Sequence, residues 1–269
     1  MQLEIQRTAH ALRVDKVDLS VAAIQRGGSL APILFLHGFG STKEDYADIA
    51  RHPEFDGHPF LAYDAPGCGE TDCADLARIS IPFLVQTAIA MLDRAGYKQF
   101  HLVGHSMGGL TALMLAHAFP DRVLSFVNIE GNISPEDCFL SRQIVTHRQG
   151  DAESFFEAFI KRTAQAPAYA SALYASSLRH KVRARAVPAI FGSMVDLSDH
   201  GELMDKFLGL PFPRMFMYGE QNATLSYLAS IQERGVRLAE IPACGHFPMY
   251  SNPVSMWSEI AAFHTIVEH

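Results

Sequence analysis

The 269-residue sequence has few cysteines and no long apolar run. Its four cysteines, Cys68, Cys73, Cys138 and Cys244, lack the spacing of a zinc site or a disulfide framework, so we expect no metal and no other cofactor. No run of about eighteen apolar residues occurs, and residues 1–10 alternate apolar and charged side chains, unlike a signal peptide. The sequence therefore predicts a cytoplasmic protein without a membrane span.

An excess of positive charge is also missing. The formal net charge is −7 and the isoelectric point is about 6.0, which argues against nucleic acid as a partner. With 48% hydrophobic residues, the chain has enough apolar side chains to bury a large core. The oligomeric state is left open by these features.

Short apolar runs alternate with helical patterns along most of the chain. Residues 3–24 predict an antiparallel hairpin at a sheet edge, and buried strands are expected at residues 33–36, 60–63, 100–103, 123–129, 215–218 and 236–241. A helix start is predicted at Ser41, because Glu44 follows three residues later as in a capping box. Strands that alternate with helices predict an α/β fold, with a mostly parallel central sheet flanked by helices.

Residues 134–213 differ from the rest, because helical patterns occur there without a clear strand. We expect residues 1–133 and 214–269 to form the α/β core, and residues 134–213 to form a helical cap, or lid, inserted after the strand at residues 123–129. Ligands of such sheets bind at the carboxyl ends of the strands, so the site is expected there.

The pentapeptide Gly104-His105-Ser106-Met107-Gly108 lies between an apolar run and a helical pattern. A serine on a sharp strand-to-helix turn has its hydroxyl lifted clear of the sheet, which is the geometry of a nucleophile elbow. Glycines two residues before and after the serine allow the strand and the helix to approach closely. The pattern therefore indicates Ser106 as a nucleophile.

A serine nucleophile needs a base and donors for the oxyanion. His246, which follows the last expected strand, is the candidate base. The backbone N–H groups of Met107, directly after the serine, and of Phe39, in a Gly-rich turn, are the candidate oxyanion donors. His37 and His105 adjoin these turns and are expected to brace them.

Four motifs follow one another in the order found in a known family. They are His37-Gly38-Phe39-Gly40, Asp64-x-Pro66-Gly67-x-Gly69, Gly104-His105-Ser106-Met107-Gly108-Gly109 and Gly245-His246-Phe247-Pro248. With these motifs the chain resembles the α/β-hydrolase superfamily, in its lid-bearing, esterase- and lipase-like group. The resemblance spans nearly the whole chain outside residues 134–213, and it implies the fold more firmly than the substrate.

The sequence departs from the family pattern at the acid of the triad. Members commonly have Gly-x-x-Asp after the strand at residues 215–218, whereas this chain has Gly219-Glu220-Gln221-Asn222. Some relatives, among them a branch resembling the haloalkane dehalogenases, take the acid from the end of the preceding strand, where this chain has Glu130. We expect Glu130 as the acid, with Glu220 or another carboxylate, or a degraded or Asn222-assisted triad, as the alternatives.

These residues predict a carboxylic ester hydrolase of the EC 3.1.1 class, acting through an acyl-enzyme on Ser106. Aromatic side chains between residues 139 and 191 suit a small-molecule substrate with an apolar acyl or alkyl group. The basic residues Arg179, Lys181, Arg183 and Arg185 are expected on a solvated helix face, with a guide for an anionic substrate as the alternative. A carbon–carbon bond hydrolase, a cofactor-free peroxidase and a non-catalytic ligand-binding receptor of the same fold are the alternatives.

Overall fold

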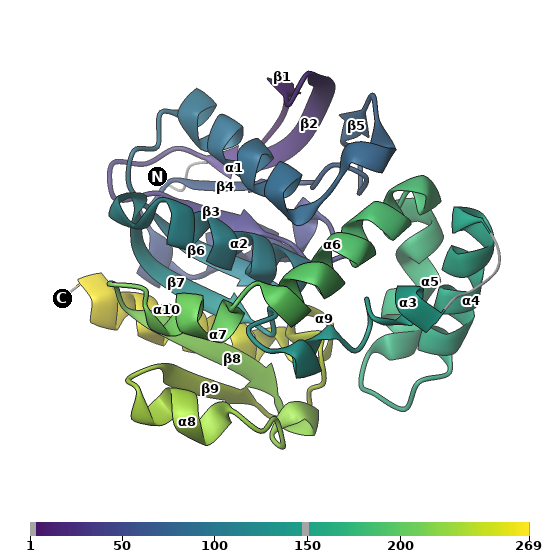
Figure 1. The fold of residues 1–269 in the computed structure, drawn as a ribbon. Helices are drawn as coiled ribbons and strands as arrows, with labels where there is room; N and C mark the ends of the chain where they lie inside the picture. Colours follow the sequence, from purple (N-terminus) through teal and green to yellow (C-terminus); the bar gives the residue numbers. More distant parts are fainter. Residues whose placement is uncertain (1–3, 147–150, 269) are drawn as a thin grey trace.

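Within residues 4–146 and 151–268, which the computed structural model describes, nine strands form one sheet (Figure 1). The strands are β1 (Gln6–Val14), β2 (Val17–Arg26), β3 (Ile33–Leu36), β4 (Phe60–Tyr63), β5 (Asp72–Cys73), β6 (Phe100–His105), β7 (Val123–Ile129), β8 (Arg214–Gly219) and β9 (Arg237–Ile241). Their order is β1-β2-β4-β3-β6-β7-β8-β9, and the short β5 pairs with β2.

The sheet is antiparallel at one edge and parallel elsewhere. The predicted hairpin is confirmed, because β1 pairs with β2 antiparallel at the edge of the sheet. Strand β2 also pairs antiparallel with β4, whereas the pairings from β4 through β3, β6, β7 and β8 to β9 are all parallel. Parallel strands need crossover connections, and helices supply them here. The predicted mostly parallel α/β fold is confirmed.

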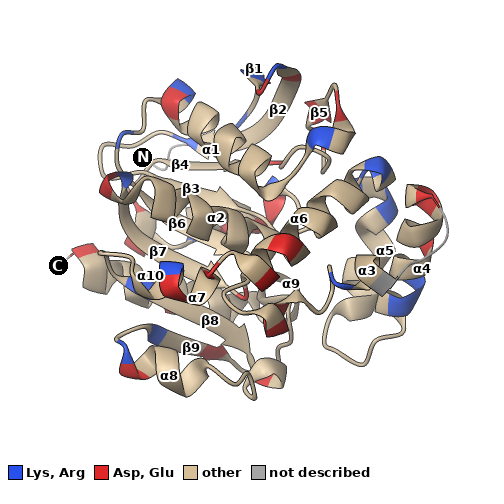
Figure 2. Cartoon of the chain, in the orientation of Figure 1, with Lys and Arg blue, Asp and Glu red and all other residues tan. Residues whose placement is uncertain are grey.

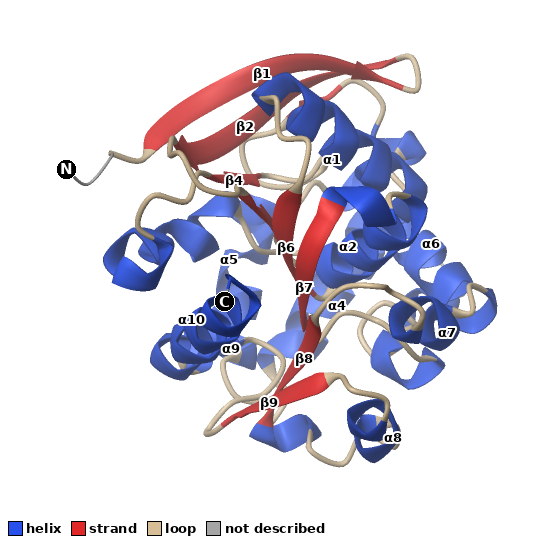
Figure 3. Cartoon of the chain, turned by 90° about the vertical axis from the view of Figure 1, so that its left-hand side faces the viewer, coloured by secondary structure: helices blue, strands red, loops and turns tan. Residues whose placement is uncertain are grey.

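Helices cover both faces of the sheet (Figure 3). The α-helices are α1 (Ile81–Ala95), α2 (Met107–Ala118), α3 (Gln143–Thr146), α4 (Ala152–Ala164), α5 (Ser171–Lys181), α6 (Val187–His200), α7 (Leu203–Leu208), α8 (Leu228–Glu233), α9 (Pro248–Ser251) and α10 (Pro253–Glu268). The 3₁₀ helices are η1 (Lys43–Arg51), η2 (Pro53–Phe55), η3 (Leu76–Arg78), η4 (Pro120–Arg122), η5 (Pro135–Cys138), η6 (Ala184–Ala186) and η7 (Glu220–Asn222). No described helix is both long and apolar enough to cross a bilayer.

One helix start differs from the expectation. The predicted capping box at Ser41 is wrong, because η1 begins at Lys43 as a 3₁₀ helix and no side chain caps it. The Ser41 hydroxyl instead lies 3.3 Å from the hydroxyl of Tyr250. A tertiary contact between distant segments has therefore replaced the local capping interaction.

The central strands form the core of the molecule. Every residue of β3, β4 and β6 is buried, and so is nearly every residue of β7. Figure 2 shows no charged residue along β3, β6 or β7. Continuous apolar strands of this kind are typical of parallel sheets that are covered on both faces. The polar residues of the site follow these strands at their carboxyl ends.

The segment between β7 and β8 contains η5, α3 to α7 and η6. Helices α4 and α5 lie beyond the ends of the strands (Figure 1). Helix α7 is different, because Phe207 packs against Phe126 of β7 and Phe216 of β8. The end of α5 is joined to the loop after β4, since Gly69 N–H donates to Lys181 O. The division into a core and a cap of residues 134–213 stays a prediction.

Candidate active site

Ser106 lies on a sharp turn between β6 and α2. Its backbone has φ 51° and ψ −117°, a conformation that a residue with a side chain rarely adopts. A Cβ on Gly104 would lie 2.5 Å from Gly108 O, and a Cβ on Gly108 would lie 2.1 Å from Leu36 O. Glycine is therefore required at both positions, as the elbow pattern predicts. The turn brings the serine to the carboxyl end of β6.

Three side chains from distant parts of the chain meet at this turn. Nε2 of His246, in the loop after β9, lies 2.9 Å from Oγ of Ser106. Nδ1 of His246 lies 2.7 Å from Oε2 of Glu130, the residue that follows β7. All three residues are buried. Because the carboxylate accepts from Nδ1–H, Nε2 is left free to accept the serine proton.

Protein donors surround the carboxylate of Glu130. Gly219 N–H donates to Oε1 at 2.7 Å, and Nδ2 of Asn222 lies 2.8 Å from Oε1 and 2.7 Å from Oε2. Glu130 itself has φ 47°, a strained value that directs its side chain away from the strand. Asn222 therefore contacts the carboxylate rather than the histidine ring. This interaction escaped the sequence-based prediction.

Glu220, the alternative acid, lies elsewhere. Its Oε2 accepts a hydrogen bond from Ala243 N–H at 2.7 Å, and no described contact joins it to His246. Ala243 has φ 51°, so this carboxylate stabilises a strained turn in the loop that carries the histidine. The position of Glu220 supports a structural role.

Two further histidines adjoin the site without contacting the serine hydroxyl. Nε2 of His105 donates to the carbonyl oxygen of His246 at 2.8 Å, and burial lowers the pKa of His105 well below its ordinary value. His37 accepts from Ala65 N–H at Nε2 and donates from Nδ1 to Gly38 O. Both rings therefore connect neighbouring turns, which is the bracing position expected for them.

The turn after β3 lies directly beside the serine. A Cβ on Gly38 would be 3.2 Å from the Cβ of Ser106. Phe39 N–H, a candidate oxyanion donor, has no partner among the described residues. Met107, the other candidate, is the first residue of α2, so its N–H has no carbonyl one turn earlier. The hydroxyl of Tyr174, from α5, donates to Phe39 O at 2.7 Å, a contact that sequence patterns did not indicate.

A small chamber of about 20 Å³ lies at the serine. Phe139, Tyr174 and Phe191 contribute to its lining, together with Phe39 and Phe247. Phe155 and Phe159 do not line the chamber, and their rings pack against each other and against Phe191 instead. Aromatic side chains thus make up much of the lining, with Asn132, Asp137 and Ser141 as further polar residues beside the reacting group.

Metal ligands do not gather in the described parts of the chain, residues 4–146 and 151–268. No group of three or more histidine, cysteine, aspartate or glutamate side chains there is placed to hold a metal ion. The four cysteines carry free thiols. Asp64 accepts from Nζ of the buried Lys43 at 2.8 Å and from Glu70 N–H at 2.8 Å, so it stabilises the loop after β4.

Comparison with known proteins identifies the family. The profile described as the alpha/beta hydrolase fold matches residues 31–253, which is most of the chain. The chain belongs to this family. The matched region of this α/β hydrolase contains the serine elbow, the histidine loop, Glu130 and both turns with candidate oxyanion donors.

The relatives of this α/β hydrolase carry names that describe different activities. The dihydrolipoyllysine-residue acetyltransferase component of the acetoin cleaving system from Cupriavidus necator is 34% identical over 107 residues, which are 40% of this chain and only 28% of that protein. The pimeloyl-(acyl-carrier protein) methyl ester esterase from Aeromonas hydrophila subsp. hydrophila is 26% identical over 272 residues, covering 92% of this chain and 98% of that protein.

A solved structure from a study of carboxylesterases of the thaumarchaeon Nitrososphaera gargenis has a TM-score of 0.77 over 96% of this chain and 99% of that chain. Its sequence identity is 14%, so the likeness shows a shared fold.

Proposed function

We propose that this α/β hydrolase cleaves carboxylic esters of small molecules through an acyl-enzyme on Ser106. One observation supports the proposal above all, namely the unbroken chain of contacts from the Ser106 hydroxyl through His246 to Glu130, at 2.9 and 2.7 Å. These distances lie within the range at which a base takes a proton from a nucleophile and a carboxylate orients that base. The strained elbow adds to this support, because it brings the hydroxyl to the chamber.

The first half of the reaction transfers the acyl group to the enzyme. Oγ of Ser106 attacks the ester carbonyl carbon while its proton moves to Nε2 of His246. Glu130 stabilises the imidazolium that forms, because its carboxylate lies against Nδ1–H. The tetrahedral intermediate then collapses, the bond from carbon to the alkoxy oxygen breaks, and Nε2–H protonates the departing alkoxide.

The second half returns the enzyme to its starting state. A water molecule gives a proton to His246 and attacks the acyl carbon. The bond between that carbon and Oγ of Ser106 then breaks, and His246 returns the proton to the serine. The N–H groups of Phe39 and Met107 would receive the oxyanion in both halves, since both belong to turns beside Oγ.

The relatives support an ester as the first substrate class. The Aeromonas protein, which this chain matches over nearly its full length, is named as a methyl ester esterase. The nucleophile also favours acyl transfer, because a serine hydroxyl attacks a carbonyl carbon readily once a base is beside it.

The proposal is tested with a panel of short p-nitrophenyl esters and a serine-directed phosphonate. We expect turnover by the wild-type protein, loss of at least about 10³-fold in kcat with Ser106→Ala, and phosphonate labelling of Ser106 alone. Ser125→Ala is the matched control, since it removes a buried serine hydroxyl at the other end of the same strands. Tight retention of ligands without turnover would favour a receptor instead, and unlabelled Ser106 in the folded protein would contradict the mechanism.

A further inference from the structure

A second, larger cavity adjoins the chamber at Ser106. It has a volume of about 570 Å³, against about 20 Å³ for the chamber. A space of the smaller size accommodates about one water molecule, whereas small-molecule sites occupy about 300–1,000 Å³. Phe139, Leu140 and Phe247 line both spaces. Only a small group therefore fits at the serine, and the rest of a substrate needs the larger pocket.

The residues between the two spaces have fixed surroundings. Phe139 and Leu140 follow η5, where Asp137 accepts from Ile133 N–H and Ser134 N–H at 2.8 Å each. The hydroxyl of Tyr227, beyond β8, donates to the same carboxylate at 2.6 Å. The segment is thereby tied to the sheet. A substrate that reaches from the pocket to the serine must pass Phe139 and Leu140.

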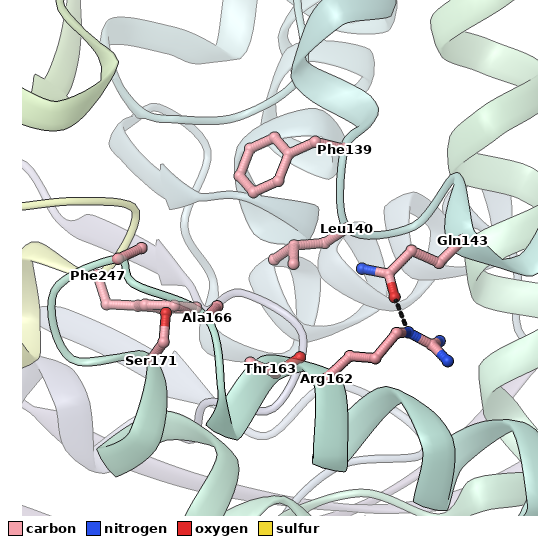
Figure 4. Close-up of a pocket in the computed structure, with 9 residues that line it drawn as sticks. Phe139, Leu140, Gln143, Arg162, Thr163, Ala166, Ser171 and Phe247 are labelled. Carbon is pink, nitrogen blue, oxygen red and sulfur yellow. Dashed lines mark hydrogen bonds between the residues drawn. The ribbon is translucent and has the colours of Figure 1, made fainter.

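The larger pocket contains one charged side chain among its described lining residues (Figure 4). This is Arg162, near the end of α4, and its Nε donates to Oε1 of Gln143 at 2.8 Å. Arg142, Arg179 and Arg185 of the segment pair with carboxylates, and Arg183 donates to Gly69 O. No described carboxylate forms an ion pair with Arg162. Its terminal N–H groups therefore remain as donors for an anion.

A second polar group lies beside Arg162. Thr163, the next residue of α4, also lines the pocket, is 4% exposed, and has a buried hydroxyl oxygen without a partner among the described residues. Figure 4 shows Arg162 and Thr163 on α4, with the Arg162 side chain hydrogen-bonded to Gln143. A buried hydroxyl without a partner is unfavourable, but its oxygen is shielded from solvent, so Arg162 is the group that offers donors to a ligand in the pocket.

We propose that this pocket binds the apolar chain of an elongated ester whose far end is a carboxylate, and that Arg162 recognises this carboxylate. The ester carbonyl then lies at Ser106, and because the chamber there is small, the alcohol is expected to be small as well. The inference rests on the proposed function and extends it, because it gives the substrate class as the monoester of a dicarboxylic acid with a small alcohol.

A simpler explanation exists for an arginine at position 162, in the last turn of α4, and a control variant can distinguish it from substrate recognition. A cation there interacts favourably with the helix dipole whatever the substrate. Lys161 lies in the same turn and does not line the pocket, so it shares the dipole interaction alone. Lys161→Met is therefore the matched control for Arg162→Met.

The test compares monoethyl esters of straight-chain dicarboxylic acids with ethyl esters of monocarboxylic acids of equal chain length. We expect wild-type kcat/KM to be about tenfold higher for the best dicarboxylic monoester, and this preference to shrink as salt rises. Arg162→Met should remove about tenfold for the monoester and less than twofold for the neutral ester. Arg162→Lys should keep part of the preference, and Lys161→Met all of it. Equal losses on both ester series with Arg162→Met would overturn the proposal.

Binding separates this inference from the proposed function. In the Ser106→Ala background, calorimetry should detect a dicarboxylic monoester, with weaker binding once Arg162→Met is added. Charge-dependent binding without turnover of any ester by the wild type would leave the pocket assignment standing and remove the ester hydrolase. Turnover that depends on Ser106 but not on the charge at the far end of the substrate would support the ester hydrolase and overturn the pocket assignment.

Discussion

Strands β6 and β7 bring a serine, a histidine and a glutamate together at both of their ends. At the carboxyl ends these are the proposed catalytic residues. At the amino ends, Nδ1 of His101 lies 2.8 Å from Oγ of Ser125, and its Nε2 lies 2.9 Å from Oε1 of Glu268. The same three kinds of side chain meet twice, so their proximity alone does not distinguish a hydrolytic site.

Backbone and access differ between the two ends. Ser125 is an ordinary residue of β7, whereas Ser106 lies on a strained turn with φ 51°. The space beside Ser125 is about 10 Å³ and is lined by His101 and His264 among others. The chamber at Ser106 adjoins the 570 Å³ pocket. A nucleophile needs room for a carbonyl group, and only the carboxyl end has it.

The two carboxylates also differ. The side chain of Glu130 is 4% exposed and accepts hydrogen bonds from Gly219 and Asn222 besides His246, so its orientation is fixed. The side chain of Glu268 is 35% exposed, at the end of α10, and its contact with His101 lacks the alignment of a hydrogen bond. What distinguishes the proposed catalytic end is therefore a carboxylate held in place by several hydrogen bonds, and not merely a carboxylate close to a histidine.

Removing the acid at each end gives the largest expected contrast. Glu130→Gln should lower kcat by about 10³- to 10⁴-fold, because an amide cannot offset the charge that develops on His246. Glu268→Gln should leave kcat within about twofold, since the residue lies at the other end of the strands. Steady-state kinetics on a short p-nitrophenyl ester, with circular dichroism to check folding, measure both variants. A folded Glu130→Gln enzyme with unimpaired turnover would refute Glu130 as the acid.

A smaller effect is expected at Tyr174, which contacts the turn that holds the Phe39 N–H. In the part of the chain that the structure describes, the amino ends of β6 and β7 have no such turn beside Ser125. Tyr174→Phe removes the hydrogen bond to Phe39 O, so the turn with the Phe39 N–H loses one constraint. We expect kcat to fall about five- to tenfold with little change in KM, because the oxyanion forms only along the reaction. Kinetics on the same ester measure this effect.

Tyr46→Phe is the control for Tyr174→Phe. Its hydroxyl is also buried and donates to a backbone carbonyl, that of Leu36, at 3.2 Å. Each substitution should cost about 1 kcal/mol of unfolding free energy, measurable by urea denaturation. Only Tyr174→Phe should lower kcat. Equal kcat losses in the two variants would mean that Tyr174 acts through stability rather than by positioning the turn.

The sequence allowed the fold and much of the candidate site to be predicted, because their signals are local. The apolar run before Ser106 and the glycines around it specify strand, turn and helix within a few residues. The interaction of Asn222 with Glu130 joins positions 92 residues apart, and that of Tyr174 with Phe39 joins positions 135 apart. No local pattern specifies such pairs, because they depend on how separate elements pack. Ser41 was missed for the same reason, since its partner is Tyr250.

The amino-end histidines have a consequence for acid stability. Burial, together with the smaller effect of neighbouring histidines, lowers the pKa of both His101 and His264 to about 4. His264 also lies 3.2 Å from His58 through their Nε2 atoms, and Glu268 faces the group. In the unfolded chain these histidines titrate near their ordinary pKa of about 6.5. Between about pH 6.5 and pH 4 the unfolded state therefore binds more protons than the folded state.

His264→Gln tests this difference with no expected effect on turnover at neutral pH. The unfolding free energy of the wild type should fall as pH drops from 6.5 to 4, since each unit of lowered pKa corresponds to about 1.4 kcal/mol. Glutamine keeps a polar group beside His58 but does not titrate, so the variant should lose less stability over this interval. Urea denaturation at pH 7.5, 6, 5 and 4.5 measures the slope, and His180→Gln, at an exposed histidine, is the control. Identical slopes in the wild type and His264→Gln would show that acid stability depends on other groups. A shallower slope with unchanged kcat at pH 7.5 would show that the histidines at the amino ends of β6 and β7 act on stability, whereas the residues at the carboxyl ends act on turnover.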